Sequence, residues 1–158
     1  MRAISLFSSI GLAETFLEEL DIEIILANEI DKKRAELYQH LYPKTKMICD
    51  NICKDEVVKE IISKHKNIDI LIATPPCQGM SIAGNMSILD SRNQLISYAV
   101  KIIKKIKPKF VFLENVPRQL KTKIEINNKV ILIPEYLENE LSKEYNINEE
   151  KIARSMDY

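Results

Sequence analysis

The side chain of this sequence best suited to nucleophilic chemistry is a cysteine in a proline-rich loop. Cys77 lies in the run Pro75-Pro76-Cys77-Gln78-Gly79-Met80-Ser81. The two prolines fix φ and extend the backbone, so they would hold the thiol in a defined place. Such a loop is unlike the apolar surroundings of a cysteine that only fills a core. A thiolate is a strong nucleophile, but a free thiol has a pKa of about 8.5, so Cys77 would need local activation.

A carboxyl group follows another apolar run further along the chain. Glu114 lies in Leu113-Glu114-Asn115-Val116-Pro117, at the end of the apolar residues 110–113, just as the Cys77 loop follows residues 68–73. When parallel strands form an open sheet, ligands bind beyond their carboxyl ends, so residues that follow different strands meet at one edge. The pattern therefore predicts the thiol and the carboxyl at the same edge, where Glu114 could exchange a proton with a substrate.

Two weaker signals predict a pocket for a nucleoside that carries a charged group. The small-residue turn Phe7-Ser8-Ser9-Ile10-Gly11 leads into an expected helix, whose first amides could hold a carboxylate. The run Asn28-Glu29-Ile30-Asp31 places a carboxylate at a strand end, where it could accept both hydroxyls of a ribose. Taken singly, the turn could be only a tight connection, and Glu29 could help to cap the next helix. Together they favour S-adenosylmethionine over a dinucleotide, because a G-x-G-x-x-G turn is absent.

Short apolar runs alternate with longer stretches of helical period, which indicates an α/β fold with a mostly parallel sheet. The expected strands are residues 3–7, 22–27, 45–48, 68–73 and 110–113, with 129–133 as a sixth candidate. The expected helices are residues 12–20, 32–41, 55–64 and 94–106. A chain of 158 residues suffices for one core and is too short for two ordinary domains, so we expect one domain over residues 1–158.

The composition limits the kind of DNA contact, the cellular compartment and the metal sites that we expect. Lys plus Arg and Asp plus Glu each total 23, so the formal net charge is zero and any contact with DNA must be local. The basic segment 101–129 and the acidic segment after residue 134 are interpreted as solvated faces. Three cysteines, with no signal peptide and no membrane-spanning run, fit a reducing cytoplasm. Cys49 and Cys53 lack a second Cys or His pair, so no metal site is expected.

Three motifs, in their order and spacing, are similar to successive motifs of DNA cytosine-5 methyltransferases: Ser5 to Gly11, Pro75 to Ser81, and Glu114-Asn115-Val116. The resemblance spans nearly the whole chain. It implies the Rossmann-like fold of S-adenosylmethionine-dependent methyltransferases, incomplete at the C-terminus. It also implies a methyl-donor site formed by Phe7, Ser9, Ile10, Gly11, Asn28, Glu29, Ile30, Asn51, Ile52, Pro76 and Leu95.

The chain departs from the family pattern at several of these positions. Ser9 and Leu12 replace glycines that let backbone and cofactor approach closely. Ile30 takes the place of a usual large apolar or aromatic residue against the adenine. Asn51 stands where the family generally has Asp, and an amide oxygen makes a weaker hydrogen bond than a carboxylate. We therefore expect these positions to govern the affinity for the donor.

The resemblance implies a covalent mechanism. Cys77 would add to carbon 6 of a cytosine flipped out of double-stranded DNA, and Glu114 would hydrogen-bond or protonate ring nitrogen 3. Carbon 5 would then take the methyl group of S-adenosylmethionine. Gln78 and Ser81 would contact the DNA.

The chain ends at Ser155-Met156-Asp157-Tyr158, which resembles the start of a later family motif. The arginines that follow in the family, the target-recognition domain and the closing C-terminal elements would have to be supplied from elsewhere. Three accounts stay open: one subunit of a split enzyme that needs a complementary C-terminal chain, a truncated product, or a cleavage fragment. Two other functions also stay open, namely an inactive module that binds the donor and an RNA cytosine-5 methyltransferase.

Overall fold

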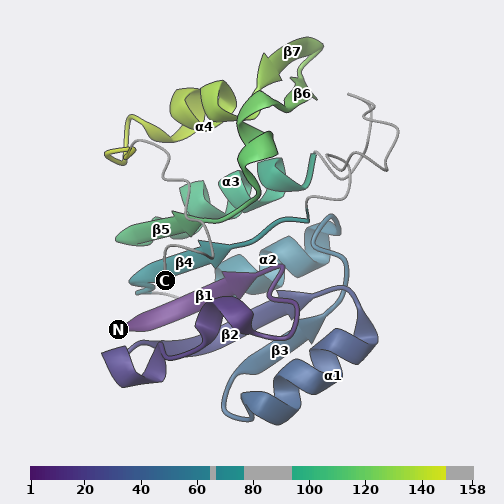
Figure 1. Ribbon diagram of the computed structural model, residues 1–158, viewed down its shortest axis with the longest axis vertical. Helices are drawn as coiled ribbons and strands as arrows, with labels where there is room; N and C mark the ends of the chain where they lie inside the picture. The colour runs from purple at the N-terminus through teal and green to yellow at the C-terminus, as the bar shows by residue number, and fades with distance from the viewer. Residues whose placement is uncertain (65–66, 77–93, 149–158) are drawn as a thin grey trace.

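The computed structural model describes residues 1–64, 67–76 and 94–148. Its centre is a sheet of five strands, β1 (Arg2–Leu6), β2 (Glu23–Glu29), β3 (Lys46–Cys49), β4 (Ile70–Ala73) and β5 (Phe110–Leu113). The strands lie in the order β3-β2-β1-β4-β5 (Figure 1), and every pairing between them is parallel. The order reverses at β1, which has β2 on one side and β4 on the other. The predicted α/β fold with a parallel sheet is confirmed.

The strands form where apolar residues run without interruption. Strands β1 and β4 bury almost every side chain, and so does β2 after its first residue. Parallel strands that are covered on both faces bury successive side chains rather than alternate ones. Strand β5 differs, because Phe110 and Phe112 on one of its faces are 61% and 55% exposed. It is the edge strand on that side of the described sheet.

Three α-helices connect the strands: α1 (Lys32–Leu41), α2 (Asp55–Lys64) and α3 (Leu95–Ile106). Each coincides with its predicted range to within one residue. Asp31 caps α1, because its side chain accepts a hydrogen bond of 3.0 Å from the backbone amide of Arg34. Helix α3 turns an apolar face into the core and carries lysines in its last turn, where cations suit the helix dipole.

The helix expected at residues 12–20 is wrong. The chain there forms two 3-10 helices of three residues each, η1 (Leu12–Glu14) and η2 (Glu18–Leu20). Between them Thr15 has φ −55° and ψ 131°, and Phe16 has φ 66°. Neither conformation continues an α-helix. The side chains that would have formed the apolar face, Leu12, Phe16 and Leu20, are 75%, 70% and 64% exposed.

After β5 the chain forms η5 (Pro117–Lys121), the strands β6 (Lys123–Ile126) and β7 (Lys129–Leu132), and α4 (Ile133–Leu141). The sixth strand expected at residues 129–133 is present as β7, but it pairs antiparallel with β6 in a sheet of its own. Asn127 and Asn128, both with positive φ, make the two-residue turn that such a hairpin requires. Figure 1 shows the hairpin and α4 beyond α3, away from the main sheet.

The main core combines side chains of the sheet with those of α2, α3 and α4. Leu6, Leu26, Leu71 and Ile102 are fully buried in it. The basic and acidic segments of the sequence meet at the surface above this core. Lys104 pairs with Glu140 at 2.6 Å and Lys107 with Glu144 at 3.1 Å, which ties the exposed side of α3 to α4 and the turn after it.

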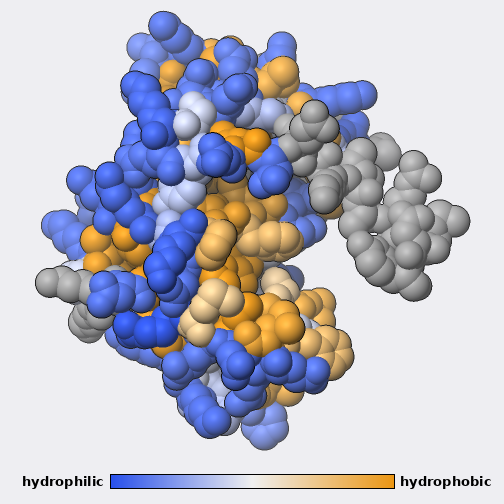
Figure 2. Space-filling view, turned by 90° about the vertical axis from the view of Figure 1, so that its left-hand side faces the viewer, coloured by the Kyte–Doolittle hydropathy of each residue, from blue (hydrophilic) through white to orange (hydrophobic). Residues whose placement is uncertain are grey.

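A hollow lies at the amino ends of the first three strands. It has a volume of about 1000 Å³ and is lined by residues that include Met1, Ile22, Leu41 and Thr45. Figure 2 looks at the side of the molecule where β1 begins, and it shows apolar side chains gathered in a hollowed strip between polar regions. This hollow is distinct from the carboxyl edge of the sheet, to which the predicted site residues belong. Within the described ranges, no helix is long and apolar enough to cross a membrane.

Candidate functional site

Apart from Leu95, which begins α3, the predicted site residues that the structure describes lie at or just after the ends of strands, and hydrogen bonds join the end of each strand to the end of its neighbour. The links run in sheet order, from β3 to β2, from β2 to β1, from β1 to β4 and from β4 to β5. Most of them use side chains rather than the strand ladder itself. This edge is where an open parallel sheet binds its ligands.

The link between β2 and β1 centres on Glu29, which is only 6% exposed. One of its carboxylate oxygens accepts the backbone amide of Ser9 at 2.9 Å, and the other accepts that of Asp31 at 2.8 Å. The backbone amide of Ser8 also donates to the carbonyl of Asn28 at 3.0 Å. Each oxygen of a carboxylate can accept a second hydrogen bond, so Glu29 is held firmly and can still accept ribose hydroxyls. Asp31 is the N-cap of α1, and Glu29 accepts its backbone amide, so the alternative that Glu29 helps to cap this helix stays open beside a role toward the ribose.

The residues 7–11 that follow β1 have an unusual backbone. We call them the donor loop, after the prediction that they bind the methyl donor. Phe7, Ser9 and Gly11 have φ values of 59°, 51° and 91°. The amide of Gly11 donates to the carbonyl of Ser8 at 2.9 Å, so Ser9 is the first central residue of a tight turn. A positive φ at that position favours glycine, and this chain has a residue with a Cβ atom there. The regular helix on which the predicted anion site was based is absent, because η1 has only three residues, and binding of a carboxylate by the amides of this turn stays a prediction.

Gly11 is buried against the ring of Tyr42. A Cβ atom at residue 11 would lie 2.3 Å from Cε2 of Tyr42, a separation that real atoms do not adopt. The positive φ of Gly11 strains any other residue as well. Both features require glycine at this position.

The link between β3 and β2 is made by the side chain of Asn28, which is buried. Its amide nitrogen donates to the carbonyls of Ile48 at 2.9 Å and Asp50 at 3.0 Å. Asn28 therefore clamps the end of β3 onto β2. This is a structural use of a residue that was expected to bind the donor, and its role toward the donor stays a prediction.

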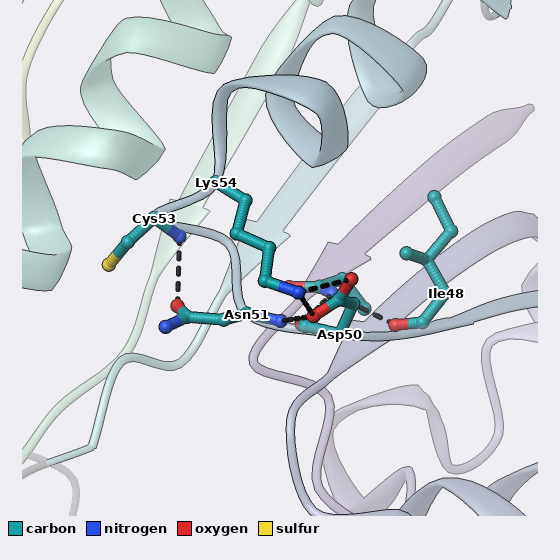
Figure 3. Close-up of polar contacts among 6 residues, drawn as sticks. Ile48, Asp50, Asn51, Cys53 and Lys54 are labelled. Carbon is teal, nitrogen blue, oxygen red and sulfur yellow. Dashed lines mark hydrogen bonds and ion pairs between the residues drawn. The ribbon is translucent and has the colours of Figure 1, made fainter.

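Asn51 follows β3 and lies in a turn that Figure 3 shows in detail. Its side-chain oxygen accepts the backbone amide of Cys53 at 2.9 Å. That oxygen was expected to accept the adenine amino group, and it keeps a second lone pair for this purpose. The neighbouring Asp50 pairs with Lys54 at 2.8 Å, and the hydrogen bond from Lys54 lowers the pKa of the Asp50 carboxyl.

The links from β1 through β4 to β5 bring the segment that leads to the predicted nucleophile, up to Pro76, together with the segment of Glu114. The hydroxyl of Thr74 donates to the carbonyl of Phe7 at 3.0 Å, and the side-chain amide of Asn115 donates to the carbonyl of Pro75 at 2.8 Å. The backbone amide of Glu114 continues the pairing of β5 with β4 through the carbonyl of Ala73 at 3.1 Å. Glu114 itself is exposed, so its carboxyl is open to a substrate.

The other predicted residues divide by exposure. Ile30 is 64% exposed directly after Glu29, and Ile52 is buried. Phe7, Ile10, Pro76 and Leu95 are half-buried. The predicted nucleophile Cys77 and the predicted DNA contacts Gln78 and Ser81 lie outside the described residues, and the description of their loop ends at Pro76.

Sequence reasoning missed three residues with a role at this edge, and it also missed the burial of Glu14, which lines the hollow at the amino ends of the strands. Asn115 and Thr74 join neighbouring loops, and Tyr42 contacts the donor loop. Asn115 lies inside a motif that had been singled out, so its side chain could have been suspected. Glu14 is buried beside the hydroxyls of Ser5 and Tyr38, and burial raises the pKa of its carboxyl. A single glutamate three residues after a glycine carries no signal of that burial.

The chain matches the family model of the C-5 cytosine-specific DNA methylases over residues 1–158. It is 45% identical over 156 residues to the Type II methyltransferase M1.HgaI of Avibacterium volantium, covering 94% of this chain and 43% of that protein. It is 39% identical over 121 residues to the Type II methyltransferase M.FnuDI of Fusobacterium nucleatum, covering 76% and 33% respectively. The chain thus spans less than half the length of these relatives.

Solved structures share the fold. A putative DNA modification methyltransferase encoded within an E. coli prophage has a TM-score of 0.70 and 25% identity, over 90% of this chain and 38% of that one. The structure of Spodoptera frugiperda DNMT2 has a TM-score of 0.52 and 26% identity, over 73% and 35%. The predicted Rossmann-like methyltransferase fold is confirmed. Because the family model matches residues 1–158, the chain belongs to the C-5 cytosine-specific DNA methylase family.

Proposed function

We propose that this chain is the donor-binding and nucleophile-bearing domain of a DNA cytosine-5 methyltransferase. It transfers a methyl group from S-adenosylmethionine to carbon 5 of a cytosine flipped out of the duplex, through a covalent adduct with Cys77. The observation that carries the proposal is the hydrogen bond from Asn115 to the carbonyl of Pro75, two residues before Cys77. It ties the loop of Glu114 to the loop of the nucleophile.

The residues present fit the methyl donor. Glu29 is a buried carboxylate, oriented by two backbone amides and with lone pairs left for ribose hydroxyls. Ile30 offers an exposed apolar side chain next to it, suited to one face of an adenine. Asn51 can accept from the adenine amino group through its second lone pair. When bound, the donor supplies an electrophilic methyl group on a sulfonium.

The residues of this chain do the rest of the chemistry on the base. Carbon 5 of cytosine is a poor nucleophile, so its electron density must first be raised. The Cys77 thiolate adds to carbon 6, while the protonated carboxyl of Glu114 donates a hydrogen bond or its proton to ring nitrogen 3 and stabilises the charge that moves into the ring. Carbon 5 then takes the methyl group, which leaves the donor as a neutral thioether. Water takes the proton of carbon 5, Glu114 takes back any proton it gave to nitrogen 3, and the Cys77 thiolate is eliminated to leave 5-methylcytosine.

The base must leave the helix stack to reach the thiol, at a cost of a few kcal/mol. Gln78 and Ser81, which follow Cys77, are the residues we assign to DNA contact. Target recognition belongs to the part of the relatives that this chain does not span, so a complementary C-terminal portion is expected as a partner. Because this chain has a formal net charge of zero, we expect that C-terminal portion to supply most of the electrostatic attraction to DNA.

The decisive experiment mixes this chain with the C-terminal remainder of a relative such as M1.HgaI and measures transfer of a labelled methyl group to unmethylated DNA. Transfer should require both parts and should be lost in Cys77→Ser. Cys49→Ser is the matched control, because Cys49 is another free cysteine, exposed at the end of β3. Transfer that survives Cys77→Ser would refute the covalent route. Label in transfer RNA instead of DNA would favour the RNA enzyme, and donor binding without any transfer would favour an inactive binding module.

A further inference from the structure

We propose that Tyr42 is a positioning residue of the methyl-donor site: it holds the donor loop from the far end of α1 and thereby sets the affinity for the donor. The proposal rests on the proposed function, since it assumes that residues 7–11 bind the donor. No family motif in the sequence includes Tyr42.

The contact between Tyr42 and the loop has two parts. The Tyr42 hydroxyl donates a hydrogen bond of 2.8 Å to the carbonyl of Gly11. The ring of the same tyrosine lies so close to Gly11 that a Cβ atom there would be 2.3 Å from Cε2. A polar tie and a close van der Waals contact therefore act on one residue of the loop.

The ring of Tyr42 is itself held in place. Tyr42 is the C-cap of α1, and its backbone amide donates to the carbonyl of Tyr38 at 2.8 Å. The two rings pack with centroids 4.8 Å apart and planes tilted by 38°, a favourable geometry for an aromatic pair. Tyr38 is fully buried. The hydroxyl that reaches the donor loop thus comes from a rigid support.

The loop needs such support because the other hydrogen bonds to the Gly11 carbonyl are local and longer, from the backbone amide of Glu14 at 3.3 Å and the hydroxyl of Thr15 at 3.5 Å. Three of its five residues have positive φ, and two of these are not glycine. A regular helix after Gly11 would fix the direction of the chain, but only the three residues of η1 follow. Glu29 holds the loop at Ser9 and Tyr42 holds it at Gly11. These two anchors flank α1 in the sequence, so the β2–α1 unit clamps the loop at two points.

Tyr42→Phe tests the proposal, because it removes only the hydroxyl. Tyr145→Phe is the matched control: the Tyr145 hydroxyl also donates to a backbone carbonyl, that of Pro108 at 2.9 Å, on the far side of α3. The dissociation constant of S-adenosylhomocysteine is measured by calorimetry on the chain and both variants. A net hydrogen bond corresponds to roughly threefold to tenfold in affinity. Tyr42→Phe should weaken binding by that factor, and Tyr145→Phe should leave it unchanged.

Two further readouts separate positioning from loss of stability. Both variants should lower the thermal midpoint by similar amounts, since each loses one hydrogen bond of the same kind. Only Tyr42→Phe should shift the carbonyl carbon resonance of Gly11. Unchanged donor affinity in Tyr42→Phe would overturn the proposal even if the protein were less stable. A wild-type chain that binds no donor would overturn the proposed donor site instead, and the Gly11 resonance would then decide whether Tyr42 anchors the loop.

Discussion

Replacing Ser9 by glycine should stabilise the protein, although glycine usually destabilises. Ser9 has φ 51° in the turn from Ser8 to Gly11. The left-handed region costs a residue with a Cβ about 1–2 kcal/mol, and glycine does not bear this cost. Against it stands the greater freedom of glycine in the unfolded chain, about 0.5–1 kcal/mol. The Ser9 backbone amide, which donates to Glu29, is kept. The net expectation is a gain of about 0.5–1 kcal/mol.

For a chain of this length such a gain raises the thermal midpoint by roughly 1–4 °C, which calorimetry or circular dichroism resolves easily. Ser8→Gly is the matched control at the neighbouring position. Ser8 is buried, does not have a positive φ, and its hydroxyl donates weakly to the carbonyl of Asn28 at 3.4 Å. That variant should lose stability by about 0.5–1 kcal/mol. A Ser9→Gly protein that is no more stable than wild type, or that behaves like Ser8→Gly, would refute the strain argument.

Two further predictions concern Glu14 and Asn115. Burial raises the pKa of Glu14, so its protonated form is the one the fold favours: this contribution is present below the ordinary glutamate pKa and is lost as pH rises through the raised one. Glu14→Gln should therefore stabilise the protein at neutral pH by about 1–3 kcal/mol. It should also flatten the pH dependence of the free energy of unfolding, measured with urea from about pH 5 to pH 8. The same pH dependence in variant and wild type would contradict this. Asn115→Ala removes the hydrogen bond to the carbonyl of Pro75. It should slow methyl transfer in the complemented enzyme on the order of tenfold to a hundredfold and leave donor affinity unchanged. A parallel loss of donor affinity would contradict the separate roles of the Asn115 segment and the donor loop.

The parallel sheet could be predicted because its strands coincide with nearly continuous apolar runs in the sequence. Helices α1, α2 and α3 could be predicted because each has an apolar face that the sheet covers. The same pattern failed at residues 12–20, since periodicity identifies a face but says nothing of what covers it. There Leu12 and Phe16 are exposed, and the left-handed backbone of Phe16 ends any helix. The strand at residues 129–133 was found, but its partner β6 is local, and the Asn127-Asn128 turn was the signal that could have shown this.

The edge that carries the site could also be predicted, because parallel strands present their carboxyl ends together. The hydrogen bonds that hold this edge together could not be predicted. The tie from Tyr42 to Gly11 spans 31 residues and that from Asn115 to Pro75 spans 40. Such contacts depend on how the elements pack, and no local pattern of residue types encodes them. The hydrogen bonds of Asn28 to the end of β3 are a third case, since they give a structural use to a residue that was expected only to bind the donor.

The hydrogen bonds along this edge explain how a chain with an irregular first connection can still present an ordered site. In a regular fold of this class, a helix after β1 would direct the donor loop. Here the same task falls to side chains from other elements, with Glu29 and Tyr42 on one side of the loop and Thr74 on the other. Each bond is worth only about 1 kcal/mol on its own. These bonds join each strand end to that of its neighbour in the sheet, so together they fix the donor loop relative to the segment leading to Cys77. That relative placement is what a methyl transfer requires.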